Sequence, residues 1–397
     1  MENSITCGGK PLRIAVFYSS EAVLGADSSG GGNYENSLSQ LLLPLRDEYG
    51  VEIINFVRSG ALNLLRRNAT LHGDPVHRYR RTPAERLLHR IPNASLGSIL
   101  AKMGLLRIRR VLRRKGVHLA YFASPNPVAM ALEDIPYVAT VWDLGHRDLP
   151  GFPEVWAQSE WSHRERLYST VVPRASFVMV DSPTTGAKLE RFYGLKSDRW
   201  QAIGLLPYVR APESPLREIS GSYIIYPAMK WPHKNHVTLL AAFALVLKKR
   251  PEMTLVLTGA DGGNSEWIKQ KIRSLGIQSS VIDLGFITKQ RLSHLVFHAK
   301  VLVMPSLLGP TNLPPLEALA LGTPAIVSSA HDFGLGEIDG LTKVSSLDVE
   351  GWANAIEGTL IKDSSPAPRQ VSSQGALETH VEVFSQLARE RENWQTD

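Results

Sequence analysis

One segment of this sequence, Val301–Ser328, has residue types at a spacing suited to holding an oxygen-rich ligand. An apolar run ends at Pro305, a polar loop follows, and Pro314 and Pro315 predict the start of a helix with Glu317 in its first turn. Free backbone N–H groups at a helix start favour an anion, and a carboxylate there accepts paired hydrogen bonds from sugar hydroxyls. The alternative is an acidic residue that only complements the helix dipole.

Two lysines, Lys230 and Lys234, follow another apolar run, Tyr223–Tyr226. An ammonium group in such a loop neutralises a phosphate, although a solvated surface lysine has the same pattern. His233 and His236 lie three residues apart, without an Asp, Glu or Cys neighbour in reach. Such a pair is commoner as ordinary loop histidines than as metal ligands, and the sequence has no Asp-x-Asp pair, so we predict no metal and no cofactor.

A glycine cluster, Gly30–Gly32, comes shortly after the apolar run Leu12–Tyr18 and before Asn33. Glycine allows the backbone to approach a phosphate closely and to adopt positive φ. Gly31, Gly32 and Asn33 are therefore candidates for binding a phosphate. A flexible loop without function would have a similar sequence.

Three further polar side chains follow the apolar run Tyr137–Val141. Asp143 and His146 are candidates for catalysis, because a carboxylate and an imidazole move protons. Arg147 is a candidate for binding an acceptor phosphate or the donor. His146 is equally compatible with a loop histidine of no catalytic role.

The apolar runs that precede these residues predict the sheets that position them. Each run is followed by a helical stretch, as in a parallel sheet wrapped by helices, and a proline-rich passage near 206–215 separates two such series. We predict two doubly wound domains, residues 1–205 and 206–375, and a final helix, 376–397, with ligands at the carboxyl ends of the strands. The runs are 12–18, 51–57, 117–123, 137–141 and 177–180, then 223–226, 253–258, 281–286, 301–305 and 325–328.

The composition agrees with two domains in a reducing compartment. The 397 residues are 43% apolar and 21% charged, which is enough to bury two cores. Cys7 is the single cysteine, so an internal disulfide and a cysteine-based metal site are excluded. No run of about eighteen uncharged apolar residues occurs, so we expect a cytoplasmic protein.

Positive charge is concentrated in the first half of the chain. Between Arg58 and Lys115 there are fifteen Lys or Arg and two acids, a local charge of +13, so the rest carries −7 of the total of +6. Residues 97–115 resemble a cationic amphipathic helix. Its partner could be an anionic membrane surface, which we favour, an anionic acceptor such as a lipid-linked diphosphate, or solvent; no motif indicates nucleic acid.

The run Leu313–Pro324 resembles the nucleotide-binding segment of retaining glycosyltransferases of family 4, which have the GT-B fold. The family has two glutamates eight positions apart, which bind the transferred sugar and the donor ribose. Glu317 matches the second, whereas Gly309 stands at the first, so this chain resembles a variant subgroup. The usual Gly-Phe-Gly of the family is replaced by Pro310-Thr311-Asn312, and the hydroxyl of Thr311 and the amide of Asn312 could bind donor sugar hydroxyls in place of the carboxylate.

The resemblance extends from the glycine cluster to near Trp352. Lys234 matches the family lysine that neutralises the donor diphosphate, while Met229 stands at the arginine position, with Lys230 as a replacement. Trp142 stands at the family histidine that reaches the transferred sugar. A GT-B fold is implied, with two Rossmann-like domains facing a central cleft and a final helix that crosses back to the first domain.

The implied activity is retaining transfer of a sugar from a nucleoside-diphosphate sugar, without a metal, at the inner face of the plasma membrane. The acceptor would be a glycan or a polyprenyl-diphosphate-linked glycan in surface polysaccharide assembly, with mannose or rhamnose as the sugar. Two alternatives remain: a GT-B sugar-nucleotide epimerase or phosphorylase, and a catalytically silent sugar-binding or nucleotide-binding subunit.

Overall fold

The structure is a computed structural model that describes residues 4–19, 30–58, 70–79, 82–84, 87, 107–204, 209, 217–309, 312–330, 337–362 and 374–395. The chain divides into two compact units. Unit 1 comprises Met1–Leu144, Trp161–Gly204 and Ser372–Asp397, and unit 2 comprises Gly145–Glu160 and Leu205–Val371. No sequence pattern marked Gly145–Glu160 as part of unit 2.

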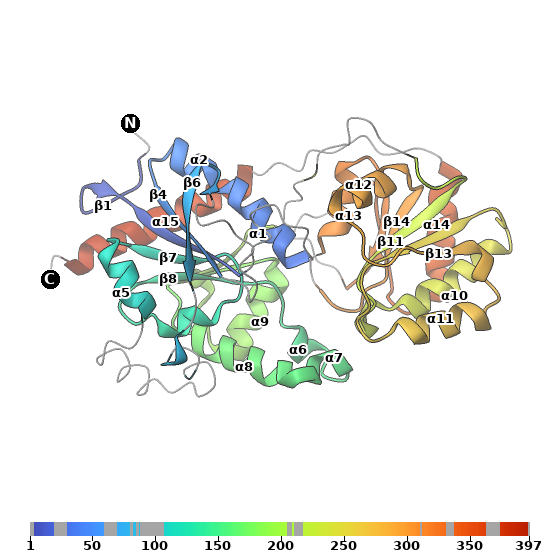
Figure 1. Cartoon of the computed structure of the whole chain (residues 1–397), viewed down its shortest axis with the longest axis horizontal. Helices are drawn as coiled ribbons and strands as arrows, with labels where there is room; N and C mark the ends of the chain where they lie inside the picture. Colours follow the sequence, from blue (N-terminus) through green and yellow to red (C-terminus); the bar gives the residue numbers. More distant parts are fainter. Residues whose placement is uncertain are drawn as a thin grey trace. The chain divides into compact units, whose positions relative to one another are not determined.

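Unit 1 contains an eight-stranded sheet in the order β10-β9-β8-β7-β3-β4-β6-β5 (Figure 1). All neighbouring strands are parallel except the β5–β6 pair. The chain moves outward from β3 through β4 to β6 and then returns to β7 on the other side of β3, which makes β3 and β7 the switch point of a doubly wound sheet. The bounds are β3 Arg13–Tyr18, β4 Glu52–Arg58, β5 Thr70–Leu71, β6 Asp74–Tyr79, β7 Leu119–Phe122, β8 Tyr137–Val141, β9 Phe177–Val180 and β10 Trp200–Ala202.

The helices of unit 1 include a first helix that starts earlier than the sequence indicated. Gly30–Asn33 is the first turn of α1 rather than a loop, because glycine adopts helical angles readily at an end where the N–H groups need no helical partner. A small hairpin, β1 Thr6–Cys7 and β2 Lys10–Pro11, lies near the start of the chain. The helices are α1 Gly30–Leu41, α2 Leu43–Asp47, α5 Arg107–Arg114, η2 Pro127–Ala131, α8 Glu160–Val171, α9 Pro183–Tyr193, η4 Ser197–Arg199 and α15 Gln374–Gln395.

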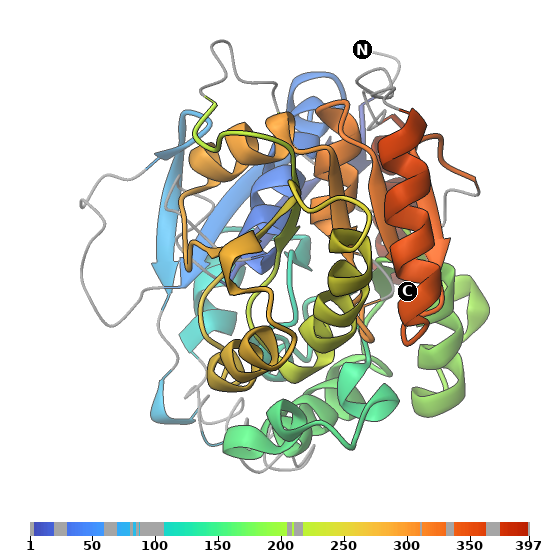
Figure 2. The ribbon, with the colours of Figure 1, turned by 90° about the vertical axis from the view of Figure 1, so that its right-hand side faces the viewer.

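Unit 2 repeats the same topology with six parallel strands in the order β13-β12-β11-β14-β15-β16. The switch point is between β11 and β14, where the chain returns to the middle of the sheet. Helices α10, α11 and α14 cover one face and α12 and α13 the other (Figure 1), and α10 and α14 lie side by side in Figure 2. The strands are β11 Tyr223–Pro227, β12 Thr254–Thr258, β13 Val281–Asp283, β14 Val301–Met304, β15 Ala325–Ser328 and β16 Leu341–Val344.

The helices of unit 2 connect these strands, and several begin with a proline or a capping side chain. The segment Gly145–Glu160 adds three short helical turns to this unit. The bounds are α6 Gly145–Asp148, α7 Pro153–Trp156, η3 Ala157–Ser159, η5 Pro232–Lys234, α10 His236–Leu247, α11 Ser265–Ser274, η6 Gln278–Ser280, α12 Lys289–His298, α13 Leu313–Ala320 and α14 Val349–Lys362.

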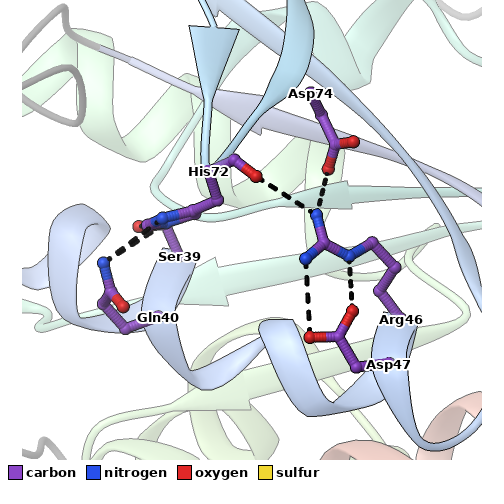
Figure 3. Close-up of polar contacts among 6 residues, drawn as sticks. All are labelled: Ser39, Gln40, Arg46, Asp47, His72 and Asp74. Carbon is purple, nitrogen blue, oxygen red and sulfur yellow. Dashed lines mark hydrogen bonds and ion pairs between the residues drawn. The ribbon is translucent and has the colours of Figure 1, made fainter.

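A polar network attaches the β5–β6 hairpin to α1 and α2 (Figure 3). His72 and Gly73 both have positive φ, of 52° and 88°, as a two-residue turn between antiparallel strands requires. The His72 ring contacts Ser39 at 3.1 Å, and the Arg46 guanidinium donates to Asp74 at 2.6 Å. Burial lowers the pKa of His72, so a neutral ring fits this place. The network holds the β5–β6 hairpin, at one edge of the sheet of unit 1, against α1 and α2.

The C-terminal helix α15 packs within unit 1, as the sequence predicted. Its anchor is His380, whose Nδ1 donates to the Ala376 carbonyl at 2.7 Å, while Nε2 accepts from the Tyr121 hydroxyl at 3.0 Å. The ring is fully buried beside Phe384, and burial lowers the pKa of His380 to about 4. The neutral ring therefore links α15 to β7.

We expect His380 to make unit 1 acid-labile. The unfolded chain takes up this proton at a pH near the ordinary value of 6.5 and the folded chain at about 4, so stability falls as the pH drops through this window. In urea unfolding, His380→Leu should reduce the slope of stability against pH by up to about 1.4 kcal/mol per pH unit. The exposed histidine variant His163→Leu is the control, and equal slopes for His380→Leu and wild type would contradict the assignment.

Candidate functional site

The candidate site of unit 2 lies at the switch point of its sheet, at the carboxyl ends of β11 and β14. Lys234 is in the loop after β11, and Asn312 is the N-cap of α13, after β14. The Lys234 ammonium donates to the Asn312 side-chain oxygen at 3.3 Å and lies 3.5 Å from the Ser306 hydroxyl. The structure thus brings together two predicted site residues and adds Ser306, which no sequence motif marked.

The loop that carries Lys234 is held by its neighbours in the sequence. Asn235 has a left-handed backbone, with φ 56°, and its side-chain NH₂ donates to the carbonyls of Pro305 and Ser346 at 3.1 and 2.8 Å. The buried Tyr226 hydroxyl donates to the Lys234 carbonyl at 2.6 Å. The loops after β11, β14 and β16 are therefore joined, and the backbone of Lys234 is fixed.

Lys230 occupies a different environment, because its side chain is only 3% exposed. Its ammonium donates to the Gly259 carbonyl at 2.7 Å and pairs with Asp283 at 3.0 Å. Gly259 has φ 107°, and a Cβ there would lie 2.3 Å from the Ala228 carbonyl oxygen. Only glycine therefore allows the backbone after β12 to lie this close to the backbone of Ala228. Lys230 therefore connects the ends of β11, β12 and β13, and its role toward a donor stays a prediction.

Glu317 lies in the second turn of α13 rather than in the first, because the helix already begins at Leu313. A carboxylate this far from the helix end gains little from the dipole, which weakens the alternative that Glu317 only complements it. Pro314 and Pro315 have no N–H, so two of the first four donors of α13 are missing. An anion would therefore be held here more by side chains than by backbone N–H groups.

The carboxylate of Glu317 is mostly buried, and burial raises its pKa. The ammonium of Lys289, the first residue of α12, lies 3.9 Å from Glu317 and lowers that pKa. Lys289 was not marked by any sequence motif. Gly309, at the start of the loop before α13, has φ 103°, which a residue with a side chain adopts only under strain. Thr311 lies outside the described residues.

Two histidines flank Lys234, in separate environments. The His233 ring nitrogen Nδ1 and backbone N–H contact the same Glu154 oxygen, at 2.6 and 3.0 Å. His236 is fully buried against Tyr226, and burial lowers its pKa to about 3. Within the described part of the chain, no group of three or more His, Cys, Asp or Glu side chains could hold a metal ion.

Unit 1 places the glycine cluster at its own switch point. Gly31, Gly32 and Asn33 are in the first turn of α1, after β3; the side chain of Asn33 is outside what the structure describes. Glu35, two residues on, is fully buried and accepts from the Ser19 N–H at 2.7 Å and the Ser124 hydroxyl at 2.6 Å. The sequence analysis missed this carboxylate, which bridges the loops after β3 and β7.

The predicted catalytic residues after β8 are divided between the two units. Asp143 belongs to unit 1, where the Arg164 guanidinium donates to its carboxylate at 2.5 Å and to its carbonyl at 3.0 Å. His146, which is fully buried, and Arg147 belong to the segment grouped with unit 2. Trp142, at the position of the family histidine, packs edge-on against Tyr34 with ring centres 5.6 Å apart.

Comparison with known proteins relates unit 2 to one family. Residues 218–367 match the family described as glycosyl transferases group 1. The matched residues make up most of unit 2. The match extends from β11 to α14 and includes the loop that holds Lys234 and the helix that holds Glu317.

Whole-chain relatives of the glycosyltransferase are enzymes of the same class. D-inositol 3-phosphate glycosyltransferase of Pseudarthrobacter chlorophenolicus is 26% identical over 361 residues, covering 84% of this chain and 82% of the relative. Glycogen synthase of Mycobacterium tuberculosis is 29% identical over 313 residues, covering 76% and 72%. The prediction of a transferase is thereby confirmed; its metal independence stays a prediction.

Solved structures confirm the predicted GT-B fold of the glycosyltransferase. Sucrose-phosphate synthase of Thermosynechococcus elongatus superposes with a TM-score of 0.66 at 20% identity and covers 97% of this chain and 98% of its own. HepE of Anabaena in complex with UDP has a TM-score of 0.63 at 18% identity, covering 96% and 99%. Among the described helices, none combines the length and apolar character needed to cross a bilayer.

Asn235 gives a test of how the loop of Lys234 is held. Asn235→Gly keeps the left-handed backbone but loses both amide bonds, whereas Asn235→Ala loses the bonds and adds strain. We expect both variants to lower the free energy of unfolding, Ala by about 1 kcal/mol more than Gly. Urea unfolding measures this, and wild-type stability of the Gly variant would show that the two bonds contribute nothing.

Proposed function

We propose that this glycosyltransferase moves a sugar, with retention of configuration, from a nucleoside-diphosphate sugar to a glycan or lipid-linked glycan. The observation that carries the proposal is the contact of Lys234 with Asn312 at the switch point of unit 2, where doubly wound sheets bind nucleotides, with Glu317 on the helix that Asn312 caps. The structural neighbour HepE is described in complex with UDP and with UDP-glucose, which supports a nucleotide-sugar donor for the present chain.

In this proposal the side chains of unit 2 bind the donor nucleotide. Lys234 neutralises the charge that develops on the departing diphosphate, and Glu317 accepts hydrogen bonds from the ribose hydroxyls. Asn312 contacts the Lys234 ammonium and would contact the diphosphate or the transferred sugar from the same loop. A departing phosphate oxygen takes the proton of the acceptor hydroxyl, so the protein acts mainly by positioning and charge neutralisation.

The loop before α13 supports assignment to a family 4 subgroup without the first glutamate. Gly309 stands where the family has that carboxylate, and its φ of 103° disfavours any other residue. The transferred sugar would then be held by backbone N–H groups, Asn312 and Thr311 rather than by a carboxylate. At the start of α1, Gly31 and Gly32 remain our candidates for donor binding and Asn33 for an acceptor or phosphate contact. After β8, Asp143 and His146 remain our candidates for catalysis, and Arg147 for an acceptor phosphate or the donor.

A second candidate function is a catalytically silent nucleotide-binding subunit. It is favoured by Lys230, whose ammonium is held by Asp283 and Gly259 instead of replacing the missing family arginine. Nucleotide binding without turnover across a panel of donors and acceptors would select this function. Conversion of a free nucleotide sugar without any acceptor would instead select an epimerase.

We expect Glu317→Ala to weaken nucleoside-diphosphate binding about tenfold or more, since a charged hydrogen-bond acceptor is lost. Lys234→Ala should lower kcat more than binding, because the charge on the leaving diphosphate grows in the transition state. Thermal-shift screening with UDP, GDP and TDP identifies the base, and donor-hydrolysis and transfer assays measure kcat and KM. Wild-type kinetics in both variants would remove the proposed site.

We further propose that unit 1 works at an anionic membrane surface on the cytoplasmic side. In α5, the exposed residues are Arg107, Arg110, Arg113 and Arg114, whereas Ile108 and Leu112 are buried. Arg113 pairs with Asp134, as does Arg109. The apolar face of α5 is therefore used in the core, so attraction to a membrane would be electrostatic; 97–106 lies outside the described residues.

Replacing Arg107, Arg110 and Arg114 with Glu should weaken binding to phosphatidylserine vesicles at least about a hundredfold. Each basic residue near an anionic surface contributes about 1 kcal/mol to the binding free energy. Vesicle co-sedimentation at low and high salt measures this binding. Neither the wild type nor the triple variant should bind to phosphatidylcholine vesicles. The matched control carries the same charge change on α11 of unit 2, at Lys269, Lys271 and Arg273. Equal loss in both triple variants would contradict a membrane surface at α5.

A further inference from the structure

Helix α12 begins with an arrangement of charge that helix electrostatics disfavours. The backbone N–H groups of a helix start carry partial positive charge, so acids stabilise the first turn and bases destabilise it. The first turn of α12 contains Lys289 and Arg291 and no acid. The Thr288 hydroxyl caps the helix by accepting from the Arg291 N–H at 3.3 Å, but it supplies no negative charge.

Each of these two cations is compensated by a carboxylate from another part of unit 2. Arg291 pairs with Glu218, with Nε 2.8 Å from Oε2, and both side chains are exposed. Lys289 instead faces Glu317, at 3.9 Å, where the Glu317 side chain is 13% exposed and that of Lys289 is 32% exposed. Solvent therefore screens the second pair less than the first.

Among the residues that the structure describes, Lys289 is the charged group that shifts the pKa of the Glu317 carboxyl. Helix α13 has no other ionisable side chain, nor do strands β14 and β15, against which it packs. On the side of β11, Lys234 contacts Asn312 at the start of α13. Burial raises the pKa of Glu317, and the Lys289 ammonium acts in the opposite direction. Without Lys289, the carboxyl would thus be protonated at a higher pH.

We propose that Lys289 is a positioning residue that keeps Glu317 ionised and oriented to accept the paired hydroxyls of a nucleoside diphosphate. Lys289 acts through Glu317 and does not touch the reacting atoms. The proposal rests on the proposed donor-binding function of Glu317. Ligand binding then explains why α12 begins with Lys289, although a cation is unfavourable there. Arg291, two residues further on, is a cation at the same helix end that has no such role.

The test is the pH dependence of nucleoside-diphosphate binding, measured by titration calorimetry between about pH 5.5 and 8.5 with whichever of UDP, GDP and TDP binds wild type. Glu317→Gln should bind weakly and retain only the pH dependence that comes from the ligand's own terminal phosphate, whose second pKa is about 6, since an amide mimics the protonated carboxyl. Relative to wild type, Lys289→Gln should lose affinity, by up to about tenfold, toward the acid end of this range and approach wild type at high pH, because its Glu317 is protonated at a higher pH.

Two controls separate this role from a structural one. Arg291→Gln removes the other first-turn cation and should leave the pH profile of binding unchanged, and Lys289→Arg should restore the wild-type profile. If wild type and Glu317→Gln differ as expected but Lys289→Gln has the wild-type profile, Lys289 has no positioning role and the donor site stands. If wild type binds none of the three nucleotides, or Glu317→Gln binds like wild type, the donor site itself is wrong.

Discussion

The candidate site of unit 2 depends on the left-handed turn at Asn235. This residue bonds two carbonyls, one in the loop after β14 and one in the loop after β16, and so joins segments that are far apart in the sequence. A left-handed backbone at a non-glycine residue costs about 1 kcal/mol, which the two hydrogen bonds of the side chain offset. Lys234 precedes this turn, so its direction is fixed by these bonds and by Tyr226.

The two lysines of the loop after β11 differ in burial and therefore in the partners of their ammonium groups. Lys230 is enclosed and paired with Asp283, because an unpaired ammonium at such a place would be costly. Lys234 is half-buried, and its ammonium contacts the neutral oxygens of Ser306 and Asn312. The matching carboxylate, Glu317, combines burial with a cation 3.9 Å away.

Both units use one topology, and in each the polar contacts of interest lie at the switch point. In unit 2 the loops after β11 and β14 meet through Asn235, and in unit 1 the loops after β3 and β7 meet through Glu35. At such a point the neighbouring connections leave the sheet on opposite faces, so the loops diverge and leave room for a ligand. Glu35 therefore deserves the same biochemical scrutiny as the residues of unit 2.

The sequence by itself determined the strands, the alternation with helices and the residues of the motif around Glu317. Apolar runs predicted most strands of both sheets because a buried parallel strand needs a continuous apolar sequence. The edge strands β5, β10 and β16 were missed, as was β6 beside β5, since partly exposed strands lack that pattern. Only the tertiary structure decided that Lys230 pairs with Asp283, that Lys289 faces Glu317 and that Gly145–Glu160 is grouped with unit 2. These pairings join residues distant in the chain, and neither residue type nor local spacing specifies which distant partner a charged side chain meets.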